Sequence, residues 1–224
     1  MSRLLEALVA SARRRRAQAL DRMIDTIAGA RGGCRIIDLG GEPGYWRSFD
    51  QEGLRTRKVH ITLVNTKANL VHDPLFDAVE ADACDLADLP SGGFDLAHSN
   101  STLEHVGEWS KMTAFAAEIH RLAPSHYVQT PYFWFPIEPH FLAPGFHWRP
   151  ETSRVRALMR RGYGHHPRCA SVTEAVETVR SARLLDRTQF EALFPQSEHS
   201  TERFAGLAKS LIATRLQEAG PSRA

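Results

Sequence analysis

Residues 35–46 read Arg35-Ile-Ile-Asp-Leu-Gly-Gly-Glu-Pro-Gly-Tyr-Trp46. The apolar start predicts a short buried strand, and the glycines after it predict a turn whose backbone can approach a ligand closely. Asp38 stands at the tip of this strand. A carboxylate there would repel a pyrophosphate but not a cationic group, so the stretch favours a ligand with a positively charged end.

Short apolar runs alternate with helical patterns along the first 130 residues. This alternation is typical of a parallel sheet covered by helices on both faces, so we predict an α/β fold with a single doubly wound, mostly parallel sheet. Ligands of such sheets bind beyond the carboxyl ends of the strands. We expect helices over residues 3–28, 45–52 and 102–122, and strands over residues 35–39, 58–64, 79–83, 94–99 and 125–130.

Prolines and aromatic side chains break the alternation in residues 131–150. A long apolar loop inside a compact domain is usually functional, so we predict a pocket wall within a substrate lid around residues 131–170. The alternative is that these aromatic residues pack over the edge of the sheet. The aromatic residues of the segment 131–150 are Tyr132, Phe133, Trp134, Phe135, Phe141, Phe146 and Trp148.

The length and composition of the chain limit the class of protein to which it can belong. The 224 residues suffice for an N-terminal helix over residues 1–30 and one domain over residues 31–224. Later helices are expected near residues 152–159 and 173–194, and a last strand or helix over 207–216. A net charge of +2 provides no general attraction to nucleic acid. The chain has no apolar run long enough to insert stably in a membrane, and three widely spaced cysteines favour the cytoplasm.

Motifs at several of the predicted strand ends resemble class I S-adenosylmethionine-dependent methyltransferases, in the branch that acts on small molecules. The resemblance covers about residues 30–150 and implies a Rossmann-like methyltransferase fold with an aromatic lid loop, S-adenosylmethionine as cofactor and a small-molecule acceptor. The motifs that carry it are Asp38-Leu-Gly-Gly-Glu-Pro-Gly44, Asp82-Ala83, Phe94-Asp95 and Ser99-Asn-Ser-Thr-Leu-Glu-His105.

The resemblance implies a set of cofactor contacts. In the glycine turn, Asp38 would lie near the amino-acid end of the cofactor, and Tyr45 and Trp46 would close the site from above. Glu42 replaces the second glycine of the family motif, which requires a turn that tolerates a side chain. The implied residues of this turn are Asp38, Gly40, Gly41, Glu42, Gly44, Tyr45 and Trp46.

Later strand ends would complete the cofactor site. Asn65 stands where the family has an acid that binds the ribose, and its amide can still form hydrogen bonds. Asp82 would face the adenine amino group, with the Ala83 amide against the ring. Ser99 and Asn100 would flank the methionine part. Taken singly, each of these residues is equally compatible with a turn or a helix cap.

The catalytic candidates are His105, His140 and Glu138. We predict that the two histidines line the acceptor pocket and that His140 or Glu138 is the base, because imidazole titrates near neutral pH. The alternative is that a histidine at a helix start is a cap or a packed polar group. Glu138, His140 and His147 match no metal-ligand spacing, so no metal is predicted.

Two other functions stay open at this point. A nicotinamide-dependent oxidoreductase needs a glycine triad followed by an acid about 20 residues later, and both Asp38 and Asn65 argue against it. A binding module that keeps the fold without catalysis is left open by the departures at Glu42 and Asn65. The sequence does not identify the acceptor.

Overall fold

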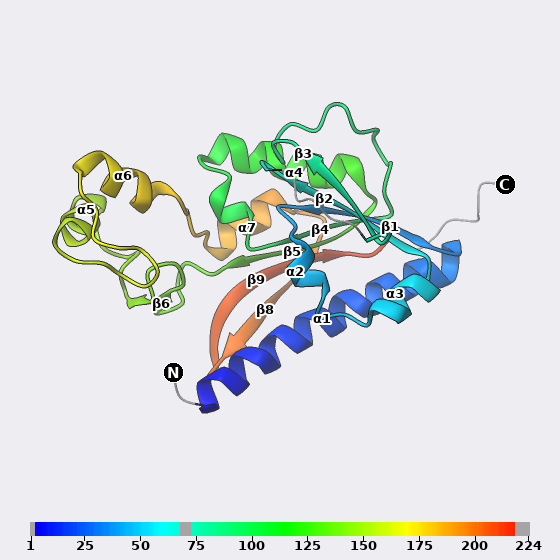
Figure 1. The fold of residues 1–224 in the computed structure, drawn as a ribbon, viewed down its shortest axis with the longest axis horizontal. Coiled ribbons are helices and arrows are strands. Elements are labelled where there is room, and N and C mark those ends of the chain that lie inside the picture. The colour runs from blue at the N-terminus through cyan, green and yellow to red at the C-terminus, as the bar shows by residue number, and fades with distance from the viewer. Residues whose placement is uncertain (1–2, 68–72, 218–224) are drawn as a thin grey trace.

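A computed structural model describes residues 3–67 and 73–217 (Figure 1). Its centre is a seven-stranded sheet with the order β3-β2-β1-β4-β5-β9-β8. The strands β1 to β5 pair in parallel, whereas β9 pairs antiparallel with both β5 and β8. The predicted doubly wound, mostly parallel sheet is confirmed. The strands are β1 Cys34–Leu39, β2 Val59–Asn65, β3 Phe76–Glu80, β4 Leu96–Asn100, β5 Ser125–Pro131, β8 Glu198–Phe204 and β9 Leu207–Arg215.

Helices cover both faces of the sheet because successive side chains of a strand point to opposite faces. Ile36 of β1 packs with Leu20 and Ile24 of α1 (Arg3–Arg31). Ile37, its neighbour in the chain, packs on the other face with Phe115. The first face carries α1, α2 (Pro43–Trp46) and α3 (Gln51–Thr56), and the second carries α4 (Trp109–Leu122) and α7 (Arg187–Leu193).

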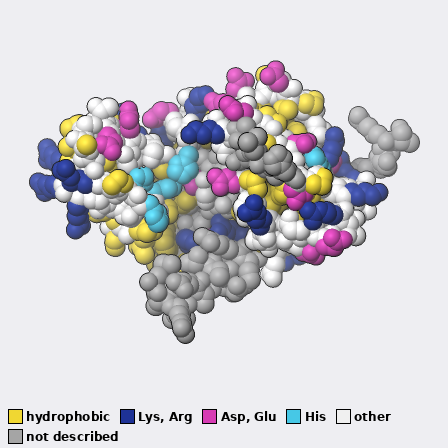
Figure 2. Space-filling model, viewed as in Figure 1, with side chains coloured by type: hydrophobic (Ala, Val, Ile, Leu, Met, Phe, Trp, Pro, Cys, Tyr) yellow, Lys and Arg dark blue, Asp and Glu magenta, His cyan; other side chains and the backbone are white. Residues whose placement is uncertain are grey.

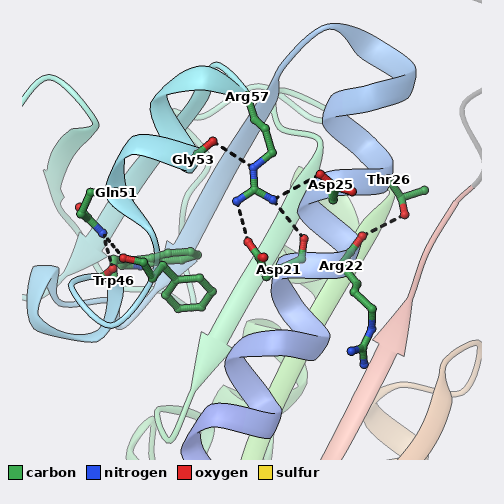
Figure 3. A network of polar contacts seen from close by, with 9 residues as sticks. Asp21, Arg22, Asp25, Thr26, Trp46, Gln51, Gly53 and Arg57 are labelled. Carbon is green, nitrogen blue, oxygen red and sulfur yellow. Dashed lines mark hydrogen bonds and ion pairs between the residues drawn. The ribbon is translucent and has the colours of Figure 1, made fainter.

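Arg57, which follows α3, fixes this helix to α1 (Figure 3). Its guanidinium bonds the Asp21 carboxylate at 2.6 Å and the Gly53 carbonyl at 3.1 Å, and lies 3.6 Å from Asp25. Gln51 donates to the Trp46 carbonyl at 2.7 Å, which links α3 to the end of α2. These contacts hold the segment after the glycine turn against the long N-terminal helix.

The segment between β5 and α7 forms a lobe that projects from the sheet (Figure 1). It contains β6 (Ile137–Glu138), β7 (Ala143–Pro144), α5 (Glu151–Arg160) and α6 (Val172–Arg180). Phe141 and Phe146 pack inside a small core of the lobe together with Leu158. These two aromatic side chains therefore form a core of their own instead of packing over the sheet edge. The predicted role of the lobe as a substrate lid stays a prediction.

Several predicted bounds differ from the structure. The helix predicted over residues 102–122 starts as a short 3-10 helix, η1 (Leu103–His105), and becomes α4 only at Trp109, because Gly107 adopts a φ of +111° between them. The helices predicted over 45–52 and 173–194 are each two helices, and the strand predicted over 79–83 is β3, three residues earlier. β8 was not predicted, since its sequence Glu-His-Ser-Thr-Glu-Arg-Phe is polar. No helix of the described segments is long and apolar enough to cross a membrane.

Candidate functional site

The glycine turn after β1 packs tightly against the protein beneath it. A Cβ added to Gly40, whose φ is +76°, would lie 2.2 Å from the Thr102 hydroxyl, and one added to Gly41 would lie 2.3 Å from Asp38 Oδ2. Around Gly44, by contrast, such an atom would meet nothing within 4 Å. Glu42 has an extended φ of −128° and an exposed side chain, so this position tolerates the residue that departs from the family motif.

Asp38 lies beneath this turn with 2% of its surface exposed. Trp46 Nε1 donates to one carboxylate oxygen at 2.7 Å, and His98 Nδ1 contacts the other at 2.7 Å. The carboxylate is therefore bonded by the protein itself and supports the turn from below. This placement differs from the direct contact with a cationic ligand that the sequence suggested.

The two aromatic residues of the turn do not close the site from above. Trp46 is fully buried in the core on the α1 face. Tyr45 stacks at a tilt on His98, with 4.9 Å between the ring centroids. Both residues extend inwards because their rings complete the apolar packing between the sheet and α1.

A group of buried polar atoms beneath the turn has no hydrogen-bond partner in the described part of the chain. The atoms are Tyr45 Oη, His98 Nε2 and Tyr127 Oη. The His98 ring lies 6.0 Å from that of Tyr127 on β5. Burial raises the pKa of Tyr45, and it raises that of Tyr127 to about 12, so both stay protonated. The sequence analysis missed His98 and Tyr127; the alternation of side chains along β4 and β5 was the available signal.

At the end of β4, the two predicted residues have partners within the protein. Ser99 is buried and donates to the Leu39 carbonyl at 3.0 Å, which ties β4 to β1. Asn100 Oδ1 accepts from Arg16 of α1 at 3.0 Å. Arg16 also lies 3.2 Å from Glu202 on β8. The contact brings a cation to the tip of β4, another feature that the sequence analysis missed.

The residues predicted at the ends of β2 and β3 lie towards the other side of the glycine turn. Asn65 Oδ1 accepts from the Thr66 amide at 2.8 Å, a local turn contact. The half-exposed Asp82 accepts from Lys111 at 2.8 Å and from the Cys84 amide at 2.9 Å. Lys111 and this amide lower the pKa of Asp82, and Ala83 beside it is buried.

The three catalytic candidates come together with a fourth residue, Glu104, at the carboxyl ends of β4 and β5. The His105 and His140 rings meet edge to face at 4.8 Å. Glu138 accepts from His140 Nδ1 at 2.7 Å and from the Phe141 amide. Figure 2 shows histidine side chains gathered at the surface beside the lobe. The structure thus unites residues that the sequence placed 35 positions apart.

Glu104 is the most enclosed member of this group, with 1% of its surface exposed. Thr130 of β5 donates to Oε2 at 2.9 Å, whereas Oε1 has no partner among the described residues. Burial raises the pKa of Glu104. Burial also pulls the pKa of His140 down, but the hydrogen bond and charge of Glu138 and the charge of Glu104 outweigh it, so that pKa lies above its usual value.

His147 lies outside this group. Its Nε2 contacts the Phe133 carbonyl at 2.6 Å, a contact that fixes the chain where it enters the lobe. Burial lowers the pKa of His147, which keeps the ring neutral. The trio of Glu138, His140 and His147 considered from the sequence is therefore not a site in the fold.

Comparison with known proteins agrees with this geometry. Residues 44–125 match the family model described as a methyltransferase domain. The match assigns a methyltransferase domain to this segment of the chain. A methyltransferase domain implies S-adenosylmethionine as cofactor, so the oxidoreductase alternative is set aside. The glycine turn fits this cofactor, because the space at Gly44 is open and two buried hydroxyls without partners among the described residues lie beneath the turn.

Solved structures of other proteins have a similar fold. A magnesium protoporphyrin IX methyltransferase from Synechocystis PCC 6803 with bound S-adenosylmethionine has a TM-score of 0.51 at 8% identity, covering 96% of this chain and 85% of that one. A protein from Bordetella parapertussis, described as possibly exported, has a TM-score of 0.54 at 13% identity, covering 91% and 68%. These likenesses concern the fold alone. No curated protein matches the chain in sequence.

Proposed function

We propose that this methyltransferase methylates a small molecule at an oxygen or nitrogen atom held over the carboxyl ends of β4 and β5. The observation that carries the proposal is the meeting of Glu104, His105 and His140 at this edge of the sheet. Parallel α/β sheets bind ligands at that edge. The fold relative from Synechocystis is named for a small-molecule substrate, which agrees with the proposal.

We assign the cofactor to the turn after β1 and the neighbouring strand ends. The turn residues Gly40, Gly41, Glu42 and Gly44 would lie against the amino-acid part, with Asn100 beside it. Asp38, Tyr45, Trp46 and Ser99 hold the turn and the strands from below. Asn65 would bind the ribose, and Asp82 and Ala83 would bind the adenine. The direct partners of Asp38, Trp46 and Ser99 within the protein support this division.

When bound, the cofactor supplies a methyl group on a sulfonium sulfur. This group would pass to the acceptor oxygen or nitrogen in one in-line displacement, in which the new C–O or C–N bond would replace the C–S bond and its electron pair would stay on sulfur. The main contribution of the protein is to hold the two reactants close and aligned. A proton also leaves the acceptor atom, and a positioned imidazole can receive it.

His140 is the residue we place beside that proton. Its Nδ1 faces a carboxylate, which only accepts hydrogen bonds, so in the neutral ring the lone pair is on Nε2. Glu138 has both oxygens engaged by His140 and the Phe141 amide, so it orients His140 and does not contact the acceptor. His105 lies against His140 and lines the same space.

We further propose that the enzyme works in the cytoplasm. Cys34, Cys84 and Cys169 are free and buried, and burial raises the pKa of Cys84 to about 11, which keeps this thiol protonated and unreactive. A protein without disulfides among its described residues suits a reducing compartment.

Two measurements on the purified chain test the proposed function. Calorimetric titration with S-adenosylhomocysteine should show saturable binding. Labelled S-adenosylmethionine incubated with a panel of small alcohols, phenols and amines should then transfer label to one class of acceptor. Binding without transfer to any small acceptor, together with transfer to a protein or nucleic acid, would overturn the small-molecule assignment.

A further inference from the structure

Three potential metal-binding side chains converge at the proposed acceptor site. One carboxylate oxygen of Glu104, one ring nitrogen of His105 and one ring nitrogen of His140 all lie within 4.8 Å of one another. We propose that these residues bind a divalent transition-metal ion of the zinc type. The inference deepens the proposed function and rests on it for the role of the ion, but not for the site itself.

In both histidines the hydrogen bond is made by Nδ1, which leaves Nε2 available to bind a metal ion. His105 Nδ1 lies 2.8 Å from the Ser181 carbonyl, and His140 Nδ1 lies 2.7 Å from the Glu138 carboxylate. Both partners can only accept, so each Nδ1 carries the hydrogen and each Nε2 of a neutral ring keeps its lone pair. A metal-binding histidine typically donates its other N–H to a carboxylate or a backbone carbonyl in this way.

Glu104 supplies an independent observation. Its carboxylate is almost fully buried, and Oε1 has no hydrogen-bond partner among the described residues. Neither Glu104 nor the buried Glu138 has a lysine or arginine within 4.0 Å in the described part of the chain. A buried carboxylate is costly unless a charge compensates it. His140 provides that charge only when its ring is protonated, whereas a dication at this point would compensate both acids.

The set of ligand atoms selects the kind of metal. Two imidazole nitrogens and one carboxylate oxygen are the three protein ligands of several catalytic zinc sites, which keep a further position open. Magnesium and calcium prefer oxygen ligands throughout. His105 is exposed, so an ion can reach the site from solvent.

The open position gives the ion a use in methyl transfer. An acceptor hydroxyl bound there has a lowered pKa and releases its proton to water, after which its oxygen attacks the methyl carbon as described above. The ion takes the Nε2 lone pair of His140, so it replaces this imidazole as the group that activates the acceptor. The sequence analysis predicted no metal and considered a different trio, with Glu138 and His147 in place of Glu104 and His105.

Metal titration tests the site directly. The full chain, stripped with a chelator, should bind one equivalent of Zn²⁺ in competition with a chromophoric chelator, and Co²⁺ should give visible bands of low coordination number. We expect His105→Ala, His140→Ala and Glu104→Gln each to weaken binding at least tenfold, and Glu138→Gln to weaken it about 10–100-fold as an outer partner. His105 is exposed, so its variant should fold even if a buried one does not.

His60→Ala is the matched control, because His60 pairs with Asp77 at 2.7 Å on the distant β2–β3 edge. Unchanged zinc affinity in this variant supports the site. Absence of stoichiometric zinc binding by the wild-type chain, or equal loss in the His60 variant, would overturn it. S-adenosylhomocysteine titration of the same samples separates the two proposals. Cofactor binding without zinc uptake rejects only the metal site, and zinc uptake without methyl transfer rejects only the proposed function.

Discussion

Asp38 and Glu104 are two buried carboxylates at the same edge of the sheet, with 2% and 1% of their surfaces exposed. Asp38 receives a hydrogen bond on each oxygen, from Trp46 and His98. Glu104 receives one from Thr130, and its other oxygen has no partner in the described residues. The two carboxylates are thus equally buried, but both oxygens of Asp38 accept a hydrogen bond, whereas only one oxygen of Glu104 has a partner among the described residues.

This difference distinguishes Asp38, an acid that supports the fold, from Glu104, an acid that can still bind a partner. Buried polar atoms in folded proteins nearly always have partners, so a satisfied carboxylate such as Asp38 stabilises the fold around the cofactor turn. An unsatisfied one such as Glu104 lowers stability until a ligand or an ion completes it. The proposed cofactor half of the site thus has its hydrogen bonds in place, while the proposed acceptor half has an unpaired carboxylate oxygen.

Replacing Asp38 with alanine should have the largest effect. Two buried donors lose their acceptor, at a cost of about 1–3 kcal/mol each, and the turn above them loses its support. We expect a lower melting temperature and no measurable binding of S-adenosylhomocysteine in calorimetry. Asp95→Ala is the control: this buried acid precedes β4 at the opposite end of the sheet and bonds Arg31 at 2.9 Å. It should lower stability but keep cofactor affinity. A folded Asp38 variant with unchanged affinity would remove the residue from the site.

Replacing His140 with alanine should lower turnover with little change in cofactor affinity. Removal of a positioned acid–base group typically costs about 10²–10⁴-fold in rate, and loss of a metal ligand would also lower the rate. Initial rates with the acceptor found in the panel, beside calorimetry with S-adenosylhomocysteine, give both quantities. Unchanged turnover would exclude His140 from the chemistry.

Asp82→Asn should weaken cofactor binding by a smaller factor. Its exposed ion pair with Lys111 contributes about 0–1 kcal/mol to stability, so the melting temperature should hardly move. If the residue binds adenine, loss of the charged acceptor should lower affinity by about tenfold, equivalent to about 1.4 kcal/mol. Asp73→Asn is a matched control, because Asp73 forms a comparable surface pair with Arg55 at 2.9 Å. Equal affinities in the two variants would count against the adenine contact.

Replacing Glu104 with glutamine tests the comparison of the two acids through the free energy of unfolding, and it should have the smallest effect. Glutamine keeps the shape and the bond from Thr130 but carries no buried charge. In the metal-free chain we expect a free energy of unfolding that is equal or higher by about 1 kcal/mol, measured by urea denaturation. Asp38→Asn should change it in the opposite direction, because one buried donor loses a charged acceptor. A clear loss of stability in the Glu104 variant would show that its carboxylate is satisfied after all.

The sequence could indicate which segments form helices and strands and that the candidate site residues lie near the ends of strands. Repeated short apolar runs predict strands because a parallel strand that is buried on both faces is mostly apolar, as β1 and β2 are. Prediction from the sequence failed where the pattern of residue types does not match the structure of the segment. β8 is a polar edge strand, and Gly107 interrupts a helical pattern near His105. Glu104 lies in one of the motifs but was not predicted as a site residue, because a glutamate beside a histidine gives no sign that it is buried.

By itself the sequence determined the doubly wound sheet and the glycine turn at the tip of β1. These features follow from local periodicity and backbone preference. Only the tertiary structure decided the state of each acid. Asp38 and His98 meet because β1 and β4 pair in parallel with these residues opposite each other. Glu104 meets His140 because the lobe, which follows β5, brings His140 to the short helix η1, which follows β4. Hydrogen bonding and burial depend on such distant neighbours, and a pattern along the chain does not contain them.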